Sequence, residues 1–478
     1  FGKSVFFEVL FFGKSVFLQH ENHGKSVIFK CDFYGKSVKY MLFRKIEKEI
    51  RDYCQSKPNK ILVVDGARQV GKSFIIRHVG QEMFDNYIEI NLLEDADGIR
   101  FFESVKTTED FYFRLSSVAK GRLGNKENTL VFLDEIQAYP HLFTMLKFLK
   151  AEDRFTYIAS GSLLGVALAK SVSIPIGSIQ VRHMYPLDFE EFLIANGLGQ
   201  DVIGYLKKQF EQELPLDEGF HAKIFDLFKK YLLVGGLPDA VNTFLATTDI
   251  VEVRRVQLEV HDYYGADASQ YDVANKLKIR NVYDSVPSNL ENKRKRVFAN
   301  RIENKPGKRF DDYLEEFDYL VNAGIALQVK AVSQPKFPLL ESMQKNLLKL
   351  YLNDVGILTG LLYGRNVAAV LDDIRSINLG SVYESVVAQE LHAHGHRLYY
   401  YDSKKHGEVD FLVESDMLLS VVPIEVKSGK DYTVHSALST FVSMQDYNVK
   451  KAYVLSNDRN VFTEEGITYL PIYYVMFL

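Results

Sequence analysis

An apolar run followed by a glycine-rich loop constrains the fold of this chain most strongly. Residues 61–65 (ILVVD) predict a buried strand, residues 66–73 read GARQVGKS, and the apolar residues after them recur at helical spacing. A strand, a G-x-x-x-x-G-K-S loop and a helix in this order are typical of a phosphate-binding loop, whose backbone N–H groups surround nucleotide phosphates. The pattern therefore predicts an α/β fold built around an ATP site.

The residues of this loop have separate expected roles. Lys72 is expected to reach the β- and γ-phosphates, and the Ser73 hydroxyl to bind Mg²⁺. Loop N–H groups would receive the phosphate oxygens. The expected ATP-binding residues are Gly66, Ala67, Arg68, Gln69, Val70, Gly71, Lys72 and Ser73.

A second motif carries two acidic residues. Residues 129–137 (TLVFLDEIQ) predict a strand with Asp134 and Glu135 at its carboxyl end, where α/β sheets place ligands. We expect Asp134 to hold Mg²⁺ and Glu135 to orient or deprotonate the attacking water. A helix cap is the alternative use of such a pair.

Three more strand patterns, at residues 87–92, 155–162 and 178–185, complete a five-stranded parallel sheet. The extra strand between the loop and Asp134 resembles ATPases that hydrolyse with a glutamate, and a nucleotide kinase is a distant alternative. Ser160 or Ser162 would end the fourth strand. Ser162 is therefore a candidate nucleotide-binding residue that senses the γ-phosphate, although a simple turn serine is equally compatible.

The first forty residues contain GKSV four times with a period of eleven. A phosphate-binding loop needs a glycine five residues before the G-K-S glycine, and these copies do not have one. We therefore expect residues 1–40 to be a disordered leader, with the folded protein starting near Met41.

Composition limits the compartment and the partners. The formal net charge is −4, so nucleic-acid binding would need a local basic patch. The two cysteines form no disulfide or zinc pattern, which fits a reducing compartment. No stretch approaches the roughly 20 apolar residues of a membrane span. These features predict a cytoplasmic protein.

The middle of the chain, residues 201–335, is predicted to be mostly helical. An amphipathic helix at 310–321 and a strand at 323–330 follow the basic run KRKR at 293–296. Helices followed by a strand resemble a winged helix, which can enter a DNA groove while basic residues meet phosphates. The alternative is a lid of the ATPase domain with its charges in solvent.

Near the carboxyl end, acidic residues lie on two neighbouring predicted strands. Asp410 lies in a strand at 408–413, and Glu425 ends the next strand, two residues before Lys427. An antiparallel hairpin would bring both carboxylates together, and strand alternation puts Glu425 and Lys427 on one face. With Glu384 from the preceding helix, these oxygens would suit Mg²⁺.

Such a cluster predicts attack on a phosphodiester. Asp410, Glu425 and Lys427 would be catalytic, with Lys427 positioning or activating water beside the metal. The alternative is a lysine–carboxylate cluster that stabilises the domain and has no catalytic activity.

Five motifs together resemble a prokaryotic family of AAA-type ATPases: GARQVGKS, FLDEIQ, ASGSLLG, SIPIGSIQVRHMYPLDFEEFL and YLLVGGLP. The resemblance runs from about residue 41 to the carboxyl end. It implies ATP binding and a C-terminal domain related to PD-(D/E)xK nucleases, with Val409 in place of the usual proline.

The family also implies roles that this chain fills only in part. The turn at 235–238 would begin the helical lid near the nucleotide. Many members have a Gly-Arg pair where this chain has Gly177 and Ser178. The arginine that a neighbouring subunit would supply in an oligomer is therefore unassigned, and Arg182 is a weak substitute.

These observations predict four regions: a leader at 1–40, an AAA-like ATPase domain at 41–200, a helical lid and winged-helix-like region at 201–335, and a nuclease-like α/β domain at 336–478. The leading hypothesis is an ATPase whose nucleotide state controls action of the nuclease-like domain on nucleic acid. The alternative is a regulatory module that binds a protein partner and has lost nuclease activity.

Overall fold

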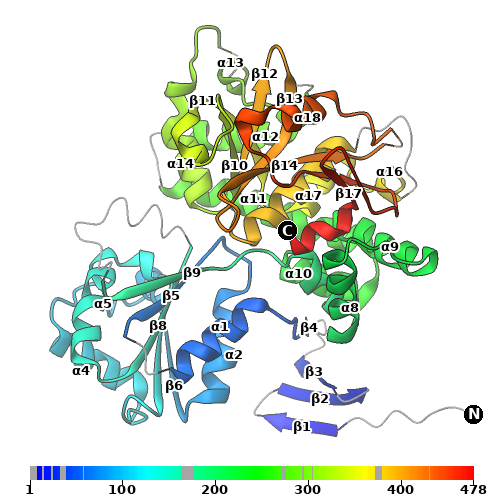
Figure 1. The fold of residues 1–478 in the computed structure, drawn as a ribbon. Helices are drawn as coiled ribbons and strands as arrows, with labels where there is room; N and C mark the ends of the chain where they lie inside the picture. The colour runs from blue at the N-terminus through cyan, green and yellow to red at the C-terminus, as the bar shows by residue number, and fades with distance from the viewer. Residues whose placement is uncertain are drawn as a thin grey trace, which may run out of the picture.

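The computed structural model describes residues 8–12, 15–22, 25–32, 39–56, 59–162, 177–271, 276–292, 295–303, 305–371, 379–429 and 431–478. Figure 1 shows a parallel-sheet unit joined by one long connection to a larger unit, in which helices and a mixed sheet pack together. The predicted α/β class is confirmed.

The first unit is a five-stranded parallel sheet with the order β6-β7-β8-β5-β9. Its strands are β5 (Ile61–Asp65), β6 (Asn86–Asn91), β7 (Thr129–Asp134), β8 (Thr156–Gly161) and β9 (Ile179–His183). The order reverses at β5, between β8 and β9, and ligands of open α/β sheets bind at such a switch point. The loop after β5 and the acidic residues after β7 therefore meet at one edge.

Helices cover both faces of this sheet (Figure 1). Their apolar residues recur at helical spacing, as in α1, where Ile46, Ile50 and Tyr53 are buried. The helices of the unit are α1 (Lys45–Gln55), α2 (Lys72–Met83), α3 (Leu92–Asp97), α4 (Thr108–Ala119) and α5 (Pro140–Glu152), with the 3₁₀ turn η1 (Ile136–Ala138). The next helix, α7 (Phe189–Ala195), packs against the middle helices.

The predicted middle helices are confirmed, and they lie against the C-terminal sheet (Figure 1). Gly235 and Gly236 separate α9 from α10, and Pro238 occupies the first turn of α10, where its missing N–H costs nothing. The helices are α8 (Gln200–Glu211), α9 (Glu218–Val234), α10 (Pro238–Thr247), α11 (Ile250–Tyr271), α12 (Lys276–Leu290), α13 (Ala299–Ile302) and α14 (Leu314–Asn322), with η2 (Phe310–Tyr313).

The second sheet has eight strands in the order β11-β10-β12-β13-β14-β15-β17-β16. The strands are β10 (Ala326–Val332), β11 (Met343–Leu352), β12 (Tyr399–Ser403), β13 (Gly407–Ser415), β14 (Ser420–Lys427), β15 (Tyr453–Ser456), β16 (Phe462–Glu464) and β17 (Ile467–Pro471). The expected boundary at residues 335 and 336 is wrong, because it falls inside this sheet: β10 pairs with β12. The strand is therefore not the wing of a separate winged helix.

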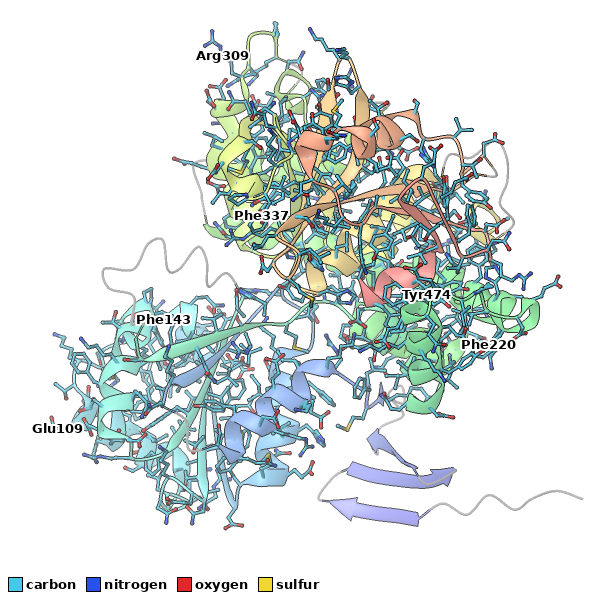
Figure 2. The ribbon with its side chains drawn as sticks, in the orientation of Figure 1. Glu109, Phe143, Phe220, Arg309, Phe337 and Tyr474 are labelled. Carbon is cyan, nitrogen blue, oxygen red and sulfur yellow. The ribbon has the colours of Figure 1, made fainter. Side chains whose placement is uncertain are left out.

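The remaining helices pack on this sheet and on the middle helices. They are α15 (Val355–Tyr363), α16 (Ala368–Leu371), α17 (Gly380–Ala393) and α18 (Ser436–Ser443), with η3 (Leu339–Ser342), η4 (Gln445–Tyr447) and η5 (Ile472–Phe477). Tyr474 of η5, labelled in Figure 2, is fully buried and packs against Phe210 of α8. The carboxyl end thus joins the sheet to the middle helices. None of the helices in the described ranges is long and apolar enough to cross a bilayer.

Part of the leader is extended and not disordered as expected. Strands β1 (Glu8–Phe12), β2 (Ser15–Asn22), β3 (Lys25–Asp32) and β4 (Lys39–Tyr40) form an antiparallel sheet. The reason lies in the repeat itself, since each copy carries valine, isoleucine or phenylalanine, which favour strands. The GKSV glycines at 2, 13, 24 and 35 lie outside the described residues.

Candidate nucleotide site

The glycine-rich loop has a backbone that only glycine fits. Gly71 has φ +97°, in the left-handed region, and leads directly into α2. At Gly66 an added Cβ would lie 2.1 Å from the carbonyl oxygen of Met184, so a side chain is excluded there. The loop therefore wraps tightly at the amino end of α2, whose free N–H groups attract anions.

Lys72 lies at the centre of this loop. Its Nζ donates hydrogen bonds of 2.8 Å to the carbonyl oxygens of both Gly66 and Ala67. Burial lowers the pKa of Lys72, while the nearby charges of Glu135 and Asp65 favour its protonated form. The ammonium group is thus held inside the loop, where a phosphate would replace the two carbonyl partners.

Asp134 lies at the end of β7, beside Ser73 and Ser160. The Ser160 hydroxyl donates to Asp134 Oδ1, and the Ser73 hydroxyl also hydrogen-bonds this carboxylate. Burial raises the pKa of Asp134, and both hydroxyls oppose the increase. A carboxylate next to a hydroxyl provides the hard oxygen ligands that Mg²⁺ prefers, so these two residues fit the predicted ion.

Glu135 is held by a short polar chain. Its backbone has φ +55°, a strained conformation for a residue with a side chain. Glu135 Oε2 accepts from the Ser162 hydroxyl at 3.0 Å and from the Gln137 amide. The Ser162 oxygen in turn accepts from Arg68 Nε at 3.1 Å. Ser162 therefore joins the loop to the acidic residue expected to act on water.

The middle helices close the site from the other side. A cavity of about 380 Å³ is lined by the loop, by Asp134 and Glu135, and by lid residues including Pro238, Asp239 and Tyr263. Arg68 Nη1 donates to the Tyr263 hydroxyl, and the Tyr264 hydroxyl donates to the Arg68 carbonyl at 2.7 Å. Helix α11 thus reaches the phosphate-binding loop directly.

Arg44, which precedes α1, belongs to no motif of the sequence. Its guanidinium donates to the carbonyl oxygens of Val70 at 2.8 Å and Tyr185 at 2.6 Å, and to Glu191 Oε2 at 3.0 Å. Arg44 is buried and lines the cavity. Its only sequence signal is a cation near the amino end of a helix, which is too common to single it out.

The C-terminal acidic residues come together as the hairpin predicts. Strands β13 and β14 pair antiparallel, and Asp410 Oδ2 accepts the Val426 N–H at 2.9 Å. Lys427 Nζ donates to Glu425 Oε1 at 2.8 Å. Burial and the charges of Glu425 and Glu384 raise the pKa of Asp410 well above its usual range, so two of these acids resist ionising together.

Glu384 is tied to other partners. Lys295 donates to Glu384 Oε1, and the Tyr351 hydroxyl donates to Oε2 at 3.1 Å. Although burial opposes ionisation, the charges of Lys295 and Lys349 hold the pKa of Glu384 below its usual value. Within the described ranges, no three histidine, cysteine or acidic side chains are placed to hold a metal ion. The metal-binding role of Glu384, Asp410 and Glu425 stays a prediction, since Glu384 faces the other two carboxylates but is hydrogen-bonded to Lys295 and Tyr351.

The two described residues of the basic run, Lys295 and Arg296, form ion pairs inside the sheet domain and do not point into solvent. Lys295 pairs with Glu384, and Arg296 pairs with Asp402, with both cationic side chains mostly buried. The other two members, Lys293 and Arg294, lie outside the described residues. The described half of the run thus neutralises acidic groups of the sheet domain.

Three family descriptions match separate parts of the chain. Residues 58–193 match "AAA domain", residues 225–367 match "Domain of unknown function (DUF8612)" and residues 379–475 match "Domain of unknown function (DUF4143)". No curated protein matches the chain. The chain therefore contains a P-loop AAA-type ATPase domain followed by two domains without an assigned function.

Three solved structures illustrate what the chain is similar to. A Walker-type ATPase of Pyrococcus abyssi is 16% identical, with a TM-score of 0.40 over 67% of this chain and 96% of its own. The RuvB Holliday junction branch migration motor of Thermotoga maritima is 14% identical, with a TM-score of 0.30 over 60% and 89%. The Orc1 protein of Aeropyrum pernix, solved in complex with DNA, is 14% identical, with a TM-score of 0.30 over 68% and 94%.

Proposed function

We propose that the chain is an ATP-hydrolysing switch whose lid transmits nucleotide state to the C-terminal sheet domain. One observation carries this proposal: the cavity that contains Lys72 and Asp134 is also lined by Pro238 and Asp239, the first residues of α10. A nucleotide in this cavity would touch both units. Its presence would therefore favour one arrangement of lid and loop over another.

The chemistry follows from the positions of the polar groups. Lys72 and the loop N–H groups would bind the β- and γ-phosphates, and Ser73 and Asp134 would hold Mg²⁺, which supplies charge neutralisation when bound. Glu135 would orient or deprotonate the attacking water, and Ser162 would position Glu135 and sense the γ-phosphate. An arginine from a neighbouring copy would complete the site. Arg182 is engaged with Glu49 at 2.6 Å, so it is a poor candidate for that role.

The lid is fixed to the sheet domain by buried hydrogen bonds. The Gly236 N–H donates to Asp354 Oδ2 at 2.6 Å, and Asp354 is the second residue after β11. Arg254 of α11 donates to the carbonyl oxygens of Leu233 and Gly356, each at 3.0 Å. Because these contacts are buried, movement of α10 against the loop would carry the sheet domain with it.

For the sheet domain, the contacts favour a regulatory module over a nuclease. Each of the three carboxylates already accepts a hydrogen bond from within the domain. Lys295 donates to Glu384, Lys427 donates to Glu425, and the backbone N–H of Val426 donates to Asp410. We infer that the carboxylates stabilise the domain and that nucleotide state controls its binding to a protein partner in the cytoplasm.

Nuclease action on DNA is a second candidate, supported by one observation. Glu425 Oε2 is buried and has no hydrogen-bond partner in the part of the chain that the structure describes. A buried unpaired carboxylate oxygen is costly, and such groups are often retained for function. Cleavage of labelled single- and double-stranded DNA with Mg²⁺, lost in Glu425→Gln, would establish this candidate. If the protein hydrolyses ATP but does not cleave DNA, the nuclease candidate is excluded and the regulatory-module proposal is supported.

The ATPase proposal is tested by steady-state hydrolysis and by ATP binding. We expect Lys72→Ala to lose both, and Glu135→Gln to bind ATP but hydrolyse it roughly 10²–10⁴-fold more slowly. Glu127→Gln, an exposed change just before β7, is the matched control and should hydrolyse at the wild-type rate. A Glu135→Gln protein with wild-type turnover would refute the assignment of Glu135.

A further inference from the structure

A second cavity, of about 240 Å³, lies between the ATPase domain and the sheet domain. Gly66 and Ala67, the two residues that follow β5, line this cavity. Gln389 and His392 of α17 also line it. It shares Met184 with the nucleotide cavity but contains neither Lys72 nor Ser73. The two cavities are therefore separate sites on either side of one loop.

Asn353 presents an unsatisfied amide to this cavity. Its side chain is 2% exposed, and neither Oδ1 nor Nδ2 has a hydrogen-bond partner among the residues that the structure describes. Leaving a buried polar group unpaired costs roughly 1–3 kcal/mol, so a core position would ordinarily carry leucine here. An asparagine that keeps one donor and one acceptor free points to a ligand that supplies both.

The neighbouring polar groups already have partners or carry no charge. The Gln389 amide accepts from the Val355 N–H and donates to the Tyr231 hydroxyl, each at 2.8 Å. Burial lowers the pKa of His392 to about 4, so its ring is neutral near pH 7. On the far side, His183 Nδ1 lies 3.2 Å from Asp65 Oδ2, and this contact raises the pKa of His183 and so favours its compensating positive charge. The cavity therefore suits an uncharged ligand.

The walls also include flat aromatic surfaces. The rings of Tyr185 and His392 both line the cavity and contact each other with centroids 5.1 Å apart. Pockets for drug-sized ligands have volumes of about 300–1,000 Å³, so a cavity of about 240 Å³ fits a smaller ring system. Aromatic walls and one amide edge are the surroundings in which proteins hold a planar heterocycle.

From this geometry we propose that the interdomain cavity binds a free, uncharged heterocycle of nucleobase size, with Asn353 hydrogen-bonding a donor and an adjacent acceptor on its edge. Adenine has this edge, since its N6 amino group donates next to the N7 acceptor and asparagine pairs with both. The site is distinct from the ATP site, and the ligand would contact the loop through Gly66 and Ala67.

Isothermal titration of the full chain with adenine tests this assignment. Saturating ADP and Mg²⁺ would first fill the nucleotide cavity, so that adenine reports on the second cavity alone. We expect adenine to bind with one site per chain. Purine, which lacks the N6 amino donor, should bind at least about tenfold more weakly, because Asn353 Oδ1 would remain unpaired.

Two variants separate a ligand site from a structural role. Asn353→Leu removes the amide, and Ala323→Leu fills the cavity while keeping Asn353, since Ala323 is a buried lining residue. Each should weaken adenine binding at least about tenfold while a cooperative urea-unfolding transition persists, which shows that the chain is folded. If one variant fails to fold, the other and the purine comparison decide the question.

The opposite results would overturn the proposal. Wild-type protein that binds no adenine up to its solubility limit would show that the cavity holds water only, since water can also pair with a buried amide. Equal affinity of wild type and Asn353→Leu would likewise exclude this site. Because the readout is binding under ADP, these outcomes are independent of whether the chain hydrolyses ATP.

Discussion

Asp354 offers the sharpest test of how the lid is fixed to the sheet domain. Its side chain is fully buried, and its two oxygens accept the N–H groups of Gly236 at 2.6 Å and Ile357 at 3.0 Å. The informative change is Asp354→Asn, which removes the ionisable group at nearly constant volume. We expect this change to alter how stability depends on pH.

The magnitude follows from the pKa. Burial raises the pKa of Asp354 from 3.8 to about 6. The folded state therefore holds the proton more tightly than the unfolded state does. This tighter proton binding adds to the free energy of unfolding. The added stability is complete below pH 3.8 and is lost as the pH rises through 6. At about 1.4 kcal/mol per pKa unit the whole effect is about 3 kcal/mol, of which about 2 kcal/mol falls between pH 4.5 and 7.

Urea unfolding of wild type and Asp354→Asn at several pH values isolates this effect. The amide nitrogen of asparagine would face a backbone N–H, and this penalty of roughly 1–3 kcal/mol does not depend on pH. The difference between the two free energies of unfolding should therefore shift by about 2 kcal/mol toward the variant between pH 4.5 and 7. Exposed Asp416→Asn is the control. A difference that stays constant with pH would refute the reasoning.

Two further changes test other contacts. Gly236→Ala would place a Cβ 2.0 Å from the carbonyl oxygen of Leu187, so the free energy of unfolding should fall by at least roughly 1–3 kcal/mol in urea titration. Lys295→Ala would remove the cation hydrogen-bonded to buried Glu384 and leave the charge of Lys349, so the free energy of unfolding should fall by up to roughly 3–5 kcal/mol, with a matching fall in Tm; unchanged stability would show that Glu384 does not need Lys295.

The arrangement of the candidate nucleotide site was predictable because its signals are local in the sequence. The strand at 61–65, the loop and α2 are consecutive, so spacing alone orders them. Asp134 could also be placed, since parallel strands in α/β sheets bring their carboxyl ends to one edge. In the C-terminal domain, Asp410 and Glu425 lie on a hairpin, where alternation and a short connection fix their approach.

The partners of these groups were not predictable, because they come from distant parts of the chain. Lys295 precedes Glu384 by 89 residues, and the pair forms only because α12 and α17 pack on the same sheet. Strand β10 directly follows a helical region in the sequence, and for that reason it was predicted to belong to that region. Its partner strand β12 comes nearly 70 residues later in the chain, so the pairing could not be read from the sequence. His392 is likewise partly buried, because the carboxyl end of α17 meets the ring of Tyr185, which is distant in the sequence.

The packing of the sheet offers the proposed switch a route from the nucleotide site to the distant domain. Residues of one face, including Leu62 and Phe132, join α2 through Ile75 and Val79 in a core that continues into the lid and the second sheet. The opposite face has its own separate cluster. Helix α2 begins at Lys72, so a phosphate bound there would contact an element of the shared core. Because close-packed cores transmit strain, we expect nucleotide binding to act on the shared face first.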